Sequence, residues 1–462
     1  MKELKEYAQL SNWLPTNGDQ FRLYELAVAG ASREGAREIL DLSSNHFNVV
    51  YKNLKDNFVN GVLSGSIKSE SKVTKLHHGI RKQYTTAMLL LRSDKKAAGI
   101  PLARATMRKA EKYGLNQIAL DLSRELRSYY GPTSPNKKLY EYYTQKQKYL
   151  INEVMNELKA EDVFYDLGFS LNKGMPIEDF KKKIEGLASL SVDSYRFHYM
   201  RWLAKVLFWQ HSGKEREMLE ACRAALKFFE SYDDVPYVIK FSFYYRAISV
   251  LISRKDFYQA EMLINRGLEE TATGRHNWQI IMLNRALLGF HSEKPAIAFS
   301  AWNKSTQVPK KHLTEAIQQR WMIVESYLAL MDFELPKKFR LGRFLNSVPL
   351  MESDKSGQNV NVVILGLMHL LKAQKLREYD DRIDQMDKYI HQHLRGKNRN
   401  RSIHFLRMLQ CVQRGGYHRV AVERKAQSYI ANLEKTTPSI SANAVELVPF
   451  MVLWKMLLDW LK

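Results

Sequence analysis

Apolar residues recur every three or four positions along most of the chain, the spacing of one face of an α-helix. Residues 244–268 show this pattern twice, separated by the polar stretch SRKD at 253–256. The two apolar sets are Tyr244, Ala247, Ile248 and Leu251, then Ala260, Leu263, Ile264 and Leu268. We therefore expect two helices that close on each other as an antiparallel hairpin through these faces.

The second of these helices has a distinctive beginning, KDFYQA at residues 255–260. Asp256 is placed to cap the helix, and the small Ala260 lets the two helix backbones approach closely. With Gly267 seven residues further on, this string resembles the second helix of a tetratricopeptide repeat (TPR). Ala296 follows Ala260 by 36 residues, close to the period of about 34 residues in such repeats, and is expected to take the same place in the next hairpin.

The resemblance covers about residues 195–310 and is looser on either side. It implies an all-α fold, a TPR-like helical-hairpin solenoid with an N-terminal helical unit; an irregular helical bundle is the alternative. Stretches rich in Gly, Pro, Ser or Asn separate three expected parts: an N-terminal helical unit (1–130), a TPR-like region (131–350), and C-terminal helical repeats with a capping helix (351–462). In that last helix the apolar residues Val448, Val452, Leu453 and Trp454 are expected to cover the final exposed stripe.

Residues 37–56, REILDLSSNHFNVVYKNLKD, resemble a helix-turn-helix motif. In the DNA-binding motif the second helix lies in the major groove, and asparagine is chemically suited to adenine. The expected base-reading residues are Asn45, His46, Asn48, Lys52 and Asn53.

Two features oppose this interpretation. Asp41 stands where the motif usually has a glycine in the turn, and residues 1–60 carry a net charge of −1, a poor match for a phosphate backbone. The alternative is a helical hairpin that only packs on the solenoid.

Charge is unevenly distributed along a chain of net charge +22. Residues 61–150 carry +12 and residues 301–462 carry +11, whereas residues 151–300 are neutral. Such zones favour anionic partners, either acidic protein surfaces or nucleic acid. The densest cluster is predicted to bind a partner through Arg395, Lys397, Arg399, Arg401 and Arg407. A solvated loop with cations at a helix end is the alternative.

The residues that carry enzymatic chemistry form no recognisable pattern. The sequence contains no GxSxG, HExxH, phosphate-loop or GxGxxG motif. The two cysteines, Cys222 and Cys411, are isolated, and the histidine pairs at 77–78 and 391/393 lack the spacing of four that places two ligands on one helix face. We expect no catalytic, cofactor-binding or metal-binding residues.

The longest apolar run, residues 362–371, is about half of the roughly 20 residues that span a bilayer. We expect a cytoplasmic protein without a membrane partner. The first expectation for function is a non-enzymatic scaffold whose TPR-like groove binds an acidic or extended peptide. The alternative is a nucleic-acid-binding regulator that reads bases through residues 37–56, and an enzyme is the least favoured class.

Overall fold

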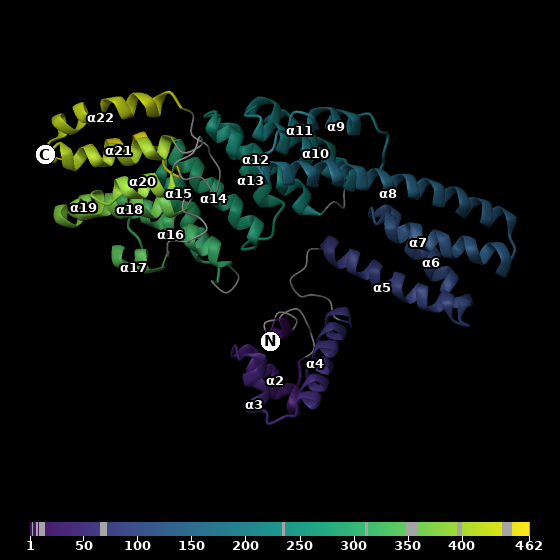
Figure 1. Cartoon of the computed structure of the whole chain (residues 1–462). Helices are drawn as coiled ribbons and strands as arrows, with labels where there is room; N and C mark the ends of the chain where they lie inside the picture. The colour runs from purple at the N-terminus through teal and green to yellow at the C-terminus, as the bar shows by residue number, and fades with distance from the viewer. Residues whose placement is uncertain are drawn as a thin grey trace. The chain divides into compact units, whose positions relative to one another are not determined.

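A computed structural model of the chain describes residues 1, 3–5, 8, 14–64, 72–232, 236–309, 313–347, 358–394, 400–436 and 446–461 (Figure 1). Over these ranges the fold is all-α and contains no strand. The chain divides into two compact units, each with its own interior. Unit 1 comprises residues 1–201 with 232–236, and unit 2 comprises residues 202–231 with 237–462.

Unit 1 has a separate core at its N-terminal end and a helical array after it. The N-terminal core is formed by α2 (Gly18–Val28), α3 (Arg33–Ile39) and α4 (Ser44–Ser64). In the array each helix packs against the next, and the array consists of α5 (Lys72–Arg92), α6 (Lys96–Lys112), α7 (Asn116–Ser128), α8 (Lys137–Asn172) and α9 (Phe180–Ala188).

The division into an N-terminal unit (1–130), a TPR-like region (131–350) and C-terminal repeats (351–462) stays a prediction. The stretch at 131–138 is only a tight connection, which includes a single π-helical turn (Tyr129–Thr133) and joins α7 to α8. Because α8 packs against α7, the residues after 131 belong to the same interior as the helices before them. The helix α10 (Tyr195–His211) then crosses from one unit to the other.

Unit 2 is a run of helical hairpins stacked in sequence order. Neighbouring helices pack in pairs, and α12 also packs against α14, α14 against α16, and α16 against α18. This arrangement is that of an α-helical solenoid. Its helices are α11 (Glu215–Glu230), α12 (Tyr237–Ser253), α13 (Phe257–Glu269), α14 (His276–His291), α15 (Pro295–Thr306), α16 (Glu315–Leu330), α17 (Leu341–Ser347), α18 (Gln358–Lys372), α19 (Leu376–Ile383), α20 (Met386–His393), α21 (Asn400–Arg414), α22 (Arg419–Glu434) and α23 (Phe450–Leu458).

The hairpin formed by α12 and α13 confirms the periodicity argument. Tyr244 and Ile248 on α12 and Ala260 and Ile264 on α13 are all buried. Asp256 caps α13 by accepting a hydrogen bond from the backbone nitrogen of Gln259 at 3.3 Å. The small side chain of Ala260, with no exposed surface, lies where the two helices meet.

A single turn geometry recurs between the helices of unit 2. One residue in each turn adopts a left-handed conformation, and its N–H donates to the carbonyl three residues back while the next N–H donates to the carbonyl five residues back. This is the Schellman motif, which satisfies carbonyls at the end of the first helix. The left-handed residues are Gly213, Lys255, Glu293, Asp332, Gln374 and Gly416.

These turn residues lie 38 to 42 residues apart, which is longer than the period of about 34 residues that characterises TPR units. The expected equivalence of Ala260 with Ala296 is therefore wrong, and Ala296 is exposed. Ala298, 38 residues after Ala260, is the buried residue at the matching place in α15. There it lies so close to Gly289 of α14 that a Cβ on Gly289 would approach the Ala298 nitrogen to 2.6 Å.

The C-terminal helix α23 packs against α18. Val448, Leu453 and Trp454 are buried and Val452 is half-buried, so these residues cover apolar surface as expected. The ring of Phe450 stacks on Phe405 of α21 with a centroid separation of 4.5 Å, which ties the last helix to the preceding hairpin.

Replacing Glu293 by glycine is expected to stabilise unit 2. Glu293 is exposed and has φ +56°, a conformation that costs a residue with a Cβ about 1 kcal/mol and costs glycine very little. The variant E293G should therefore raise the free energy of unfolding by roughly 0.5–1 kcal/mol, measured by urea denaturation. The matched control E293A removes the charge but keeps the Cβ, so it should show no such gain. Equal effects of the two variants would contradict this explanation.

Candidate nucleic-acid interface

The turn between α3 and α4 has the same Schellman geometry as the hairpin turns of unit 2. Ser32 caps α3 by accepting a hydrogen bond from the Gly35 nitrogen at 3.0 Å. Asp41 then has φ +52°, and the Leu42 nitrogen bonds back to the Arg37 carbonyl at 3.3 Å. Aspartate is one of the few residues with a Cβ that tolerates this left-handed conformation. The aspartate at the usual glycine position therefore does not disturb the turn.

The core of this N-terminal module fixes which face of α4 points outward. Phe47, Val50, Leu54 and Phe58 of α4 are buried, at spacings of three and four residues, against the buried Leu23 of α2. Further along the chain toward the N-terminus, Glu3 accepts a hydrogen bond from the Tyr51 hydroxyl at 2.7 Å, which lowers the pKa of this carboxyl group.

All five predicted base-reading residues are exposed: Asn45, His46, Asn48, Lys52 and Asn53. Val49 lies among them with 55% of its surface exposed. The structure thus brings these side chains to the outer face of α4.

Two arginines of α3 flank the beginning of α4. Arg33 donates to the Asn48 side-chain oxygen at 3.0 Å, and its guanidinium lies over the Tyr51 ring at 4.5 Å. Arg37 donates to the Ser44 hydroxyl at 2.9 Å. These contacts orient both cations along an open recess of about 370 Å³, whose lining residues are Ser32, Arg33, Glu34, Arg37, Ser44, Phe47 and Asn48. These arginines are not among the predicted binding residues, because they precede the helix that carries the predicted base-reading residues.

The structure describes two of the five residues of the predicted partner-binding cluster in the C-terminal region, Arg401 and Arg407. Arg395, Lys397 and Arg399 lie outside the described residues. Arg407 forms an ion pair with Asp387 and donates to the Gln410 side chain at 2.8 Å. The Gln410 amide and then the Arg407 guanidinium lower the pKa of the Asp387 carboxyl.

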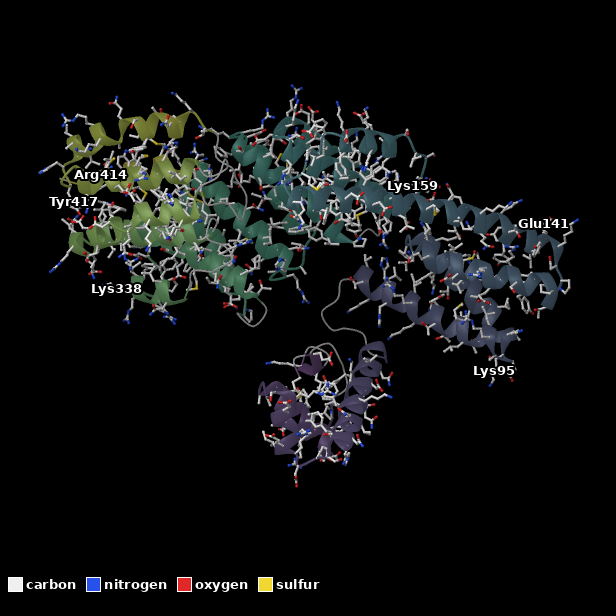
Figure 2. The ribbon with its side chains drawn as sticks, viewed as in Figure 1. Lys95, Glu141, Lys159, Lys338, Arg414 and Tyr417 are labelled. Carbon is white, nitrogen blue, oxygen red and sulfur yellow. The ribbon has the colours of Figure 1, made fainter. Side chains whose placement is uncertain are left out.

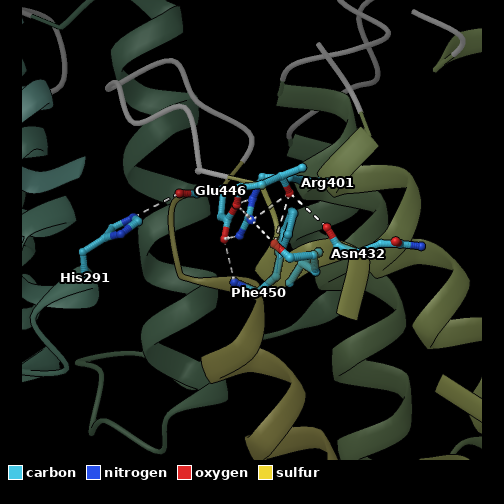
Figure 3. A network of polar contacts seen from close by, with 7 residues as sticks. His291, Arg401, Asn432, Glu446 and Phe450 are labelled. Atoms are coloured by element: carbon cyan, nitrogen blue, oxygen red, sulfur yellow. Dashed lines mark hydrogen bonds and ion pairs between the residues drawn. The ribbon is translucent and has the colours of Figure 1, made fainter. Parts of the chain in front are cut away.

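Arg401 belongs to a buried polar network (Figure 3). Its guanidinium makes a two-pronged ion pair with Glu446, at 2.7 and 2.8 Å, and also donates to the backbone carbonyls of Leu433 and Thr436 at the end of α22. Only 5% of the Glu446 side chain and 18% of the Arg401 side chain are exposed. Arg401 thus stabilises the fold by joining α21 and α22 to the segment that precedes α23.

Glu446 extends this network in two further directions. Its side chain accepts a hydrogen bond from the Phe450 nitrogen at 3.0 Å, where a carboxylate is favoured at the start of α23. Its backbone carbonyl lies 3.2 Å from the His291 ring of α14, and burial lowers the pKa of that imidazole (Figure 3). A single glutamate therefore connects α14, α21 and α23.

Unit 1 contains another group of buried polar contacts, centred on two glutamates that no sequence motif indicated. Glu153 of α8 accepts hydrogen bonds from the Asp193 and Ser194 nitrogens at 3.2 and 3.0 Å. Glu157 accepts from the Asn116 amide at 2.8 Å and from the Ser194 hydroxyl. Burial raises the pKa of both carboxyl groups. The contacts with Asp193 and Ser194 hold the chain that enters α10, and the contact with Asn116 joins α8 to the start of α7.

Other chemistry-bearing groups are dispersed. Within the described ranges no three His, Cys, Asp or Glu side chains gather as metal ligands would. Cys222 and Cys411 are free and buried, and burial raises the pKa of the Cys222 thiol to about 12. None of the helices that the structure describes combines the length and hydropathy needed to cross a bilayer.

Removing one partner of the Arg401–Glu446 pair is expected to destabilise unit 2 strongly. The variant E446Q leaves a buried guanidinium without its counter-charge, so the free energy of unfolding should fall by about 3 kcal/mol. Arg419 provides a matched control, because its ion pairs with Glu423 and Asp459 are solvent-exposed, and R419A should cost less than about 1 kcal/mol. Urea denaturation of both variants measures the difference, and similar losses would contradict a special role for the buried pair.

Comparison of the chain with models of protein families, with curated proteins and with solved structures finds no match.

Proposed function

We propose that the N-terminal module binds duplex nucleic acid through α4, in a protein whose remaining helical hairpins form a non-enzymatic binding scaffold. The observation that carries the proposal is the outward face of α4. It combines several asparagines with Lys52 and an exposed Val49, behind a turn in which Asp41 takes the conformation of glycine.

The chemistry of this face matches the edges of base pairs. Asparagine amides pair with the N6 and N7 atoms of adenine, and an apolar side chain such as Val49 is suited to the thymine methyl group. Phosphate contacts would come from Arg33, Arg37 and Lys52. The exposed Glu34 limits this basic patch, so we expect modest affinity with few phosphate contacts.

The expected salt dependence is correspondingly shallow. Three phosphate contacts give a slope of about −3 in a plot of log K against log salt concentration. We expect the full-length protein to bind duplex DNA at about 50–100 mM salt in a fluorescence-anisotropy titration, with this slope. Absence of binding at the lowest salt concentration would overturn the proposal.

Two variants separate base reading from phosphate attraction. The variant N53A should weaken binding to a selected sequence by roughly 1–3 kcal/mol, with little change for unrelated sequences, whereas Asn48 also orients Arg33. The variant K52A should weaken binding to all sequences and reduce the magnitude of the salt slope by about 1. Arg22 of α2 is an exposed control, paired only loosely with Asp19 at 3.9 Å, and R22A should change neither property.

The second proposed function is that unit 2 is a TPR-like scaffold for an acidic or extended peptide. The hairpin geometry at α13 and α14 favours it. Gly267 is packed so tightly that a Cβ there would lie 2.7 Å from the Ile281 side chain, and the Tyr237 hydroxyl donates to its carbonyl at 3.0 Å. TPR helices use small residues at corresponding places, and their grooves bind peptides. The charge of +11 in residues 301–462 favours an acidic partner.

A non-enzymatic, cytoplasmic protein fits these proposals, because two buried free thiols are compatible with a reducing compartment. The scaffold proposal is tested by incubating the protein with an array of acidic and basic peptides at two salt concentrations. We expect retention of acidic sequences that weakens as salt rises. Equal retention of acidic and basic peptides would contradict a charge-selective groove, and would leave the DNA result to be judged separately.

A further inference from the structure

The hairpin formed by α5 and α6 concentrates positive charge. Residues 72–112 contain eleven Lys and Arg residues and two Asp and Glu residues, which gives this hairpin a net charge of +9. It therefore supplies most of the +12 carried by residues 61–150. A charge of this size on two packed helices repels itself and attracts anions. Neither the proposed interface on α4 nor the proposed groove of unit 2 accounts for it.

The two acidic residues of the hairpin compensate little of this charge. Glu111 is already bound in an ion pair with Lys146 of α8 at 2.9 Å, and Asp94 lies in the turn between the two helices. Within the described part of the chain, no carboxylate lies within ion-pair distance of Arg108 or Lys112, and both side chains are exposed. These two cations are therefore available to a partner.

Arg104, Arg108 and Lys112 form a row along the outer face of α6. They follow one another at intervals of four residues, and all three are exposed. Side chains at this spacing are neighbours on a helix surface, and like charges there destabilise the helix. The row extends over about 12 Å, since each residue adds 1.5 Å of rise. An anionic chain laid along α6 would relieve the repulsion between these cations.

The positive charge continues from α6 to α5. Lys109 of α6 donates to the side-chain oxygen of Gln83 on α5 at 3.3 Å. Lys82 is next to Gln83 in the chain, and Lys75 lies about two turns before Lys82. No acidic residue occurs in α5. The cations of the two helices therefore act on the same partner.

An exposed tyrosine of α8 lies beside the row. Burial raises the pKa of Tyr143, and the neighbouring Arg104 guanidinium opposes this rise. Together with the Lys146–Glu111 pair, this contact places α8 alongside α6. Tyr142 precedes Lys146 by four residues, so both lie on the same side of α8. Tyr142 is 50% exposed, and its ring packs against the Tyr143 ring at a centroid separation of 5.0 Å.

The exposed Glu141 of α8 does not face this row. Figure 2 shows Lys95, just before α6, and Glu141, near the start of α8, at the same end of the array. Glu141 lies five residues before Lys146. At 3.6 residues per turn this separation is about 140° around the helix, so Glu141 is on a different side of α8 from the Lys146–Glu111 pair.

A row of cations with an aromatic ring at its edge fits a single-stranded nucleic acid. Every nucleotide carries a phosphate, so the strand supplies negative charge at each unit along its length. An acidic peptide would need an unbroken run of acidic residues to do the same. In a duplex the base faces are stacked on one another, whereas a single strand can place a base on an aromatic side chain.

We propose that the α5–α6 hairpin, with Tyr142 of α8, binds single-stranded nucleic acid without sequence preference. Phosphates contact Arg104, Arg108, Lys109 and Lys112, and one base stacks on the Tyr142 ring. Four phosphate contacts on a single strand give a slope of about −3 in a plot of log K against log salt concentration. This site is separate from the proposed duplex interface on α4 and does not depend on it.

Fluorescence anisotropy of the full-length protein with a labelled oligothymidylate, longer than about 16 nucleotides, tests the site at about 50–100 mM salt. The variant R108A/K112A should weaken binding at least about tenfold and reduce the magnitude of the salt slope by about 1.4. K181A/K182A is the matched control, because it removes the same charge from two exposed lysines of α9, and it should change neither property. Absence of binding by the unmodified protein, or equal effects of the two double variants, would overturn the proposal.

The variant Y142A tests the stacked base. It should weaken binding at least about fivefold and leave the salt slope unchanged. Y258A is its control, since Tyr258 of α13 is 72% exposed and belongs to unit 2. An unchanged affinity in Y142A would overturn the assignment of a single strand to this surface.

Two further measurements separate this site from the other proposals. K52A on α4 should leave oligothymidylate binding unchanged, and a loss of binding in K52A would place the strand on α4 and overturn the inference. Polyglutamate at the same concentration of negative charge should displace the strand less effectively than unlabelled oligothymidylate does. Equal displacement would identify an acidic protein as the better partner and would also overturn it.

Discussion

Burial of apolar surface between stacked helices is the constraint on which the fold depends. The helix α14 shows this most clearly, because it packs against α12, α13, α15 and α16. Eleven of its residues are buried, from Trp278 to Phe290. A single hairpin that contained such a helix would not be stable by itself, since one partner helix covers only one side of it. The stacking of successive hairpins follows directly, and the Schellman turns are the connections that permit it.

The first and last helices of such a stack have a neighbouring hairpin on one side only, so their outer apolar faces must be covered by a capping element. In unit 2 the last helix α23 folds back onto α18, and the buried pair of Arg401 with Glu446 holds its beginning in place. A buried ion pair adds little net stability over an apolar contact, but it strongly penalises any arrangement that separates its members. It therefore specifies where the C-terminal segment lies. In unit 1 the outer face of α8 exposes large apolar side chains, among them Met155, Tyr165 and Phe169.

The buried carboxylates Glu153, Glu157 and Glu446 have contacts with backbone nitrogens, amides or arginine, and each supports a helix end. The outer face of α4 presents amides, Lys52 and the apolar Val49. Such groups recognise the edges of bases and phosphates, and the proposed nucleic-acid interface uses them in that way.

The sequence by itself determined the helical class, the hairpin at 244–268, the cap at Asp256 and the outward face of α4, because these depend on periodicity and on residues close in the chain. The sequence overestimated the match to a 34-residue repeat, so Ala296 was predicted at the packed position that Ala298 occupies. The turn positions that set the period depend on helix lengths, and packing determines those lengths. Only the tertiary structure showed that Asp41 adopts a left-handed conformation and that Arg401 meets Glu446, 45 residues away. The same is true of the exposed apolar side chains of α8. Contacts between distant residues and the side of a helix left uncovered depend on the whole arrangement of neighbours, which no local pattern encodes.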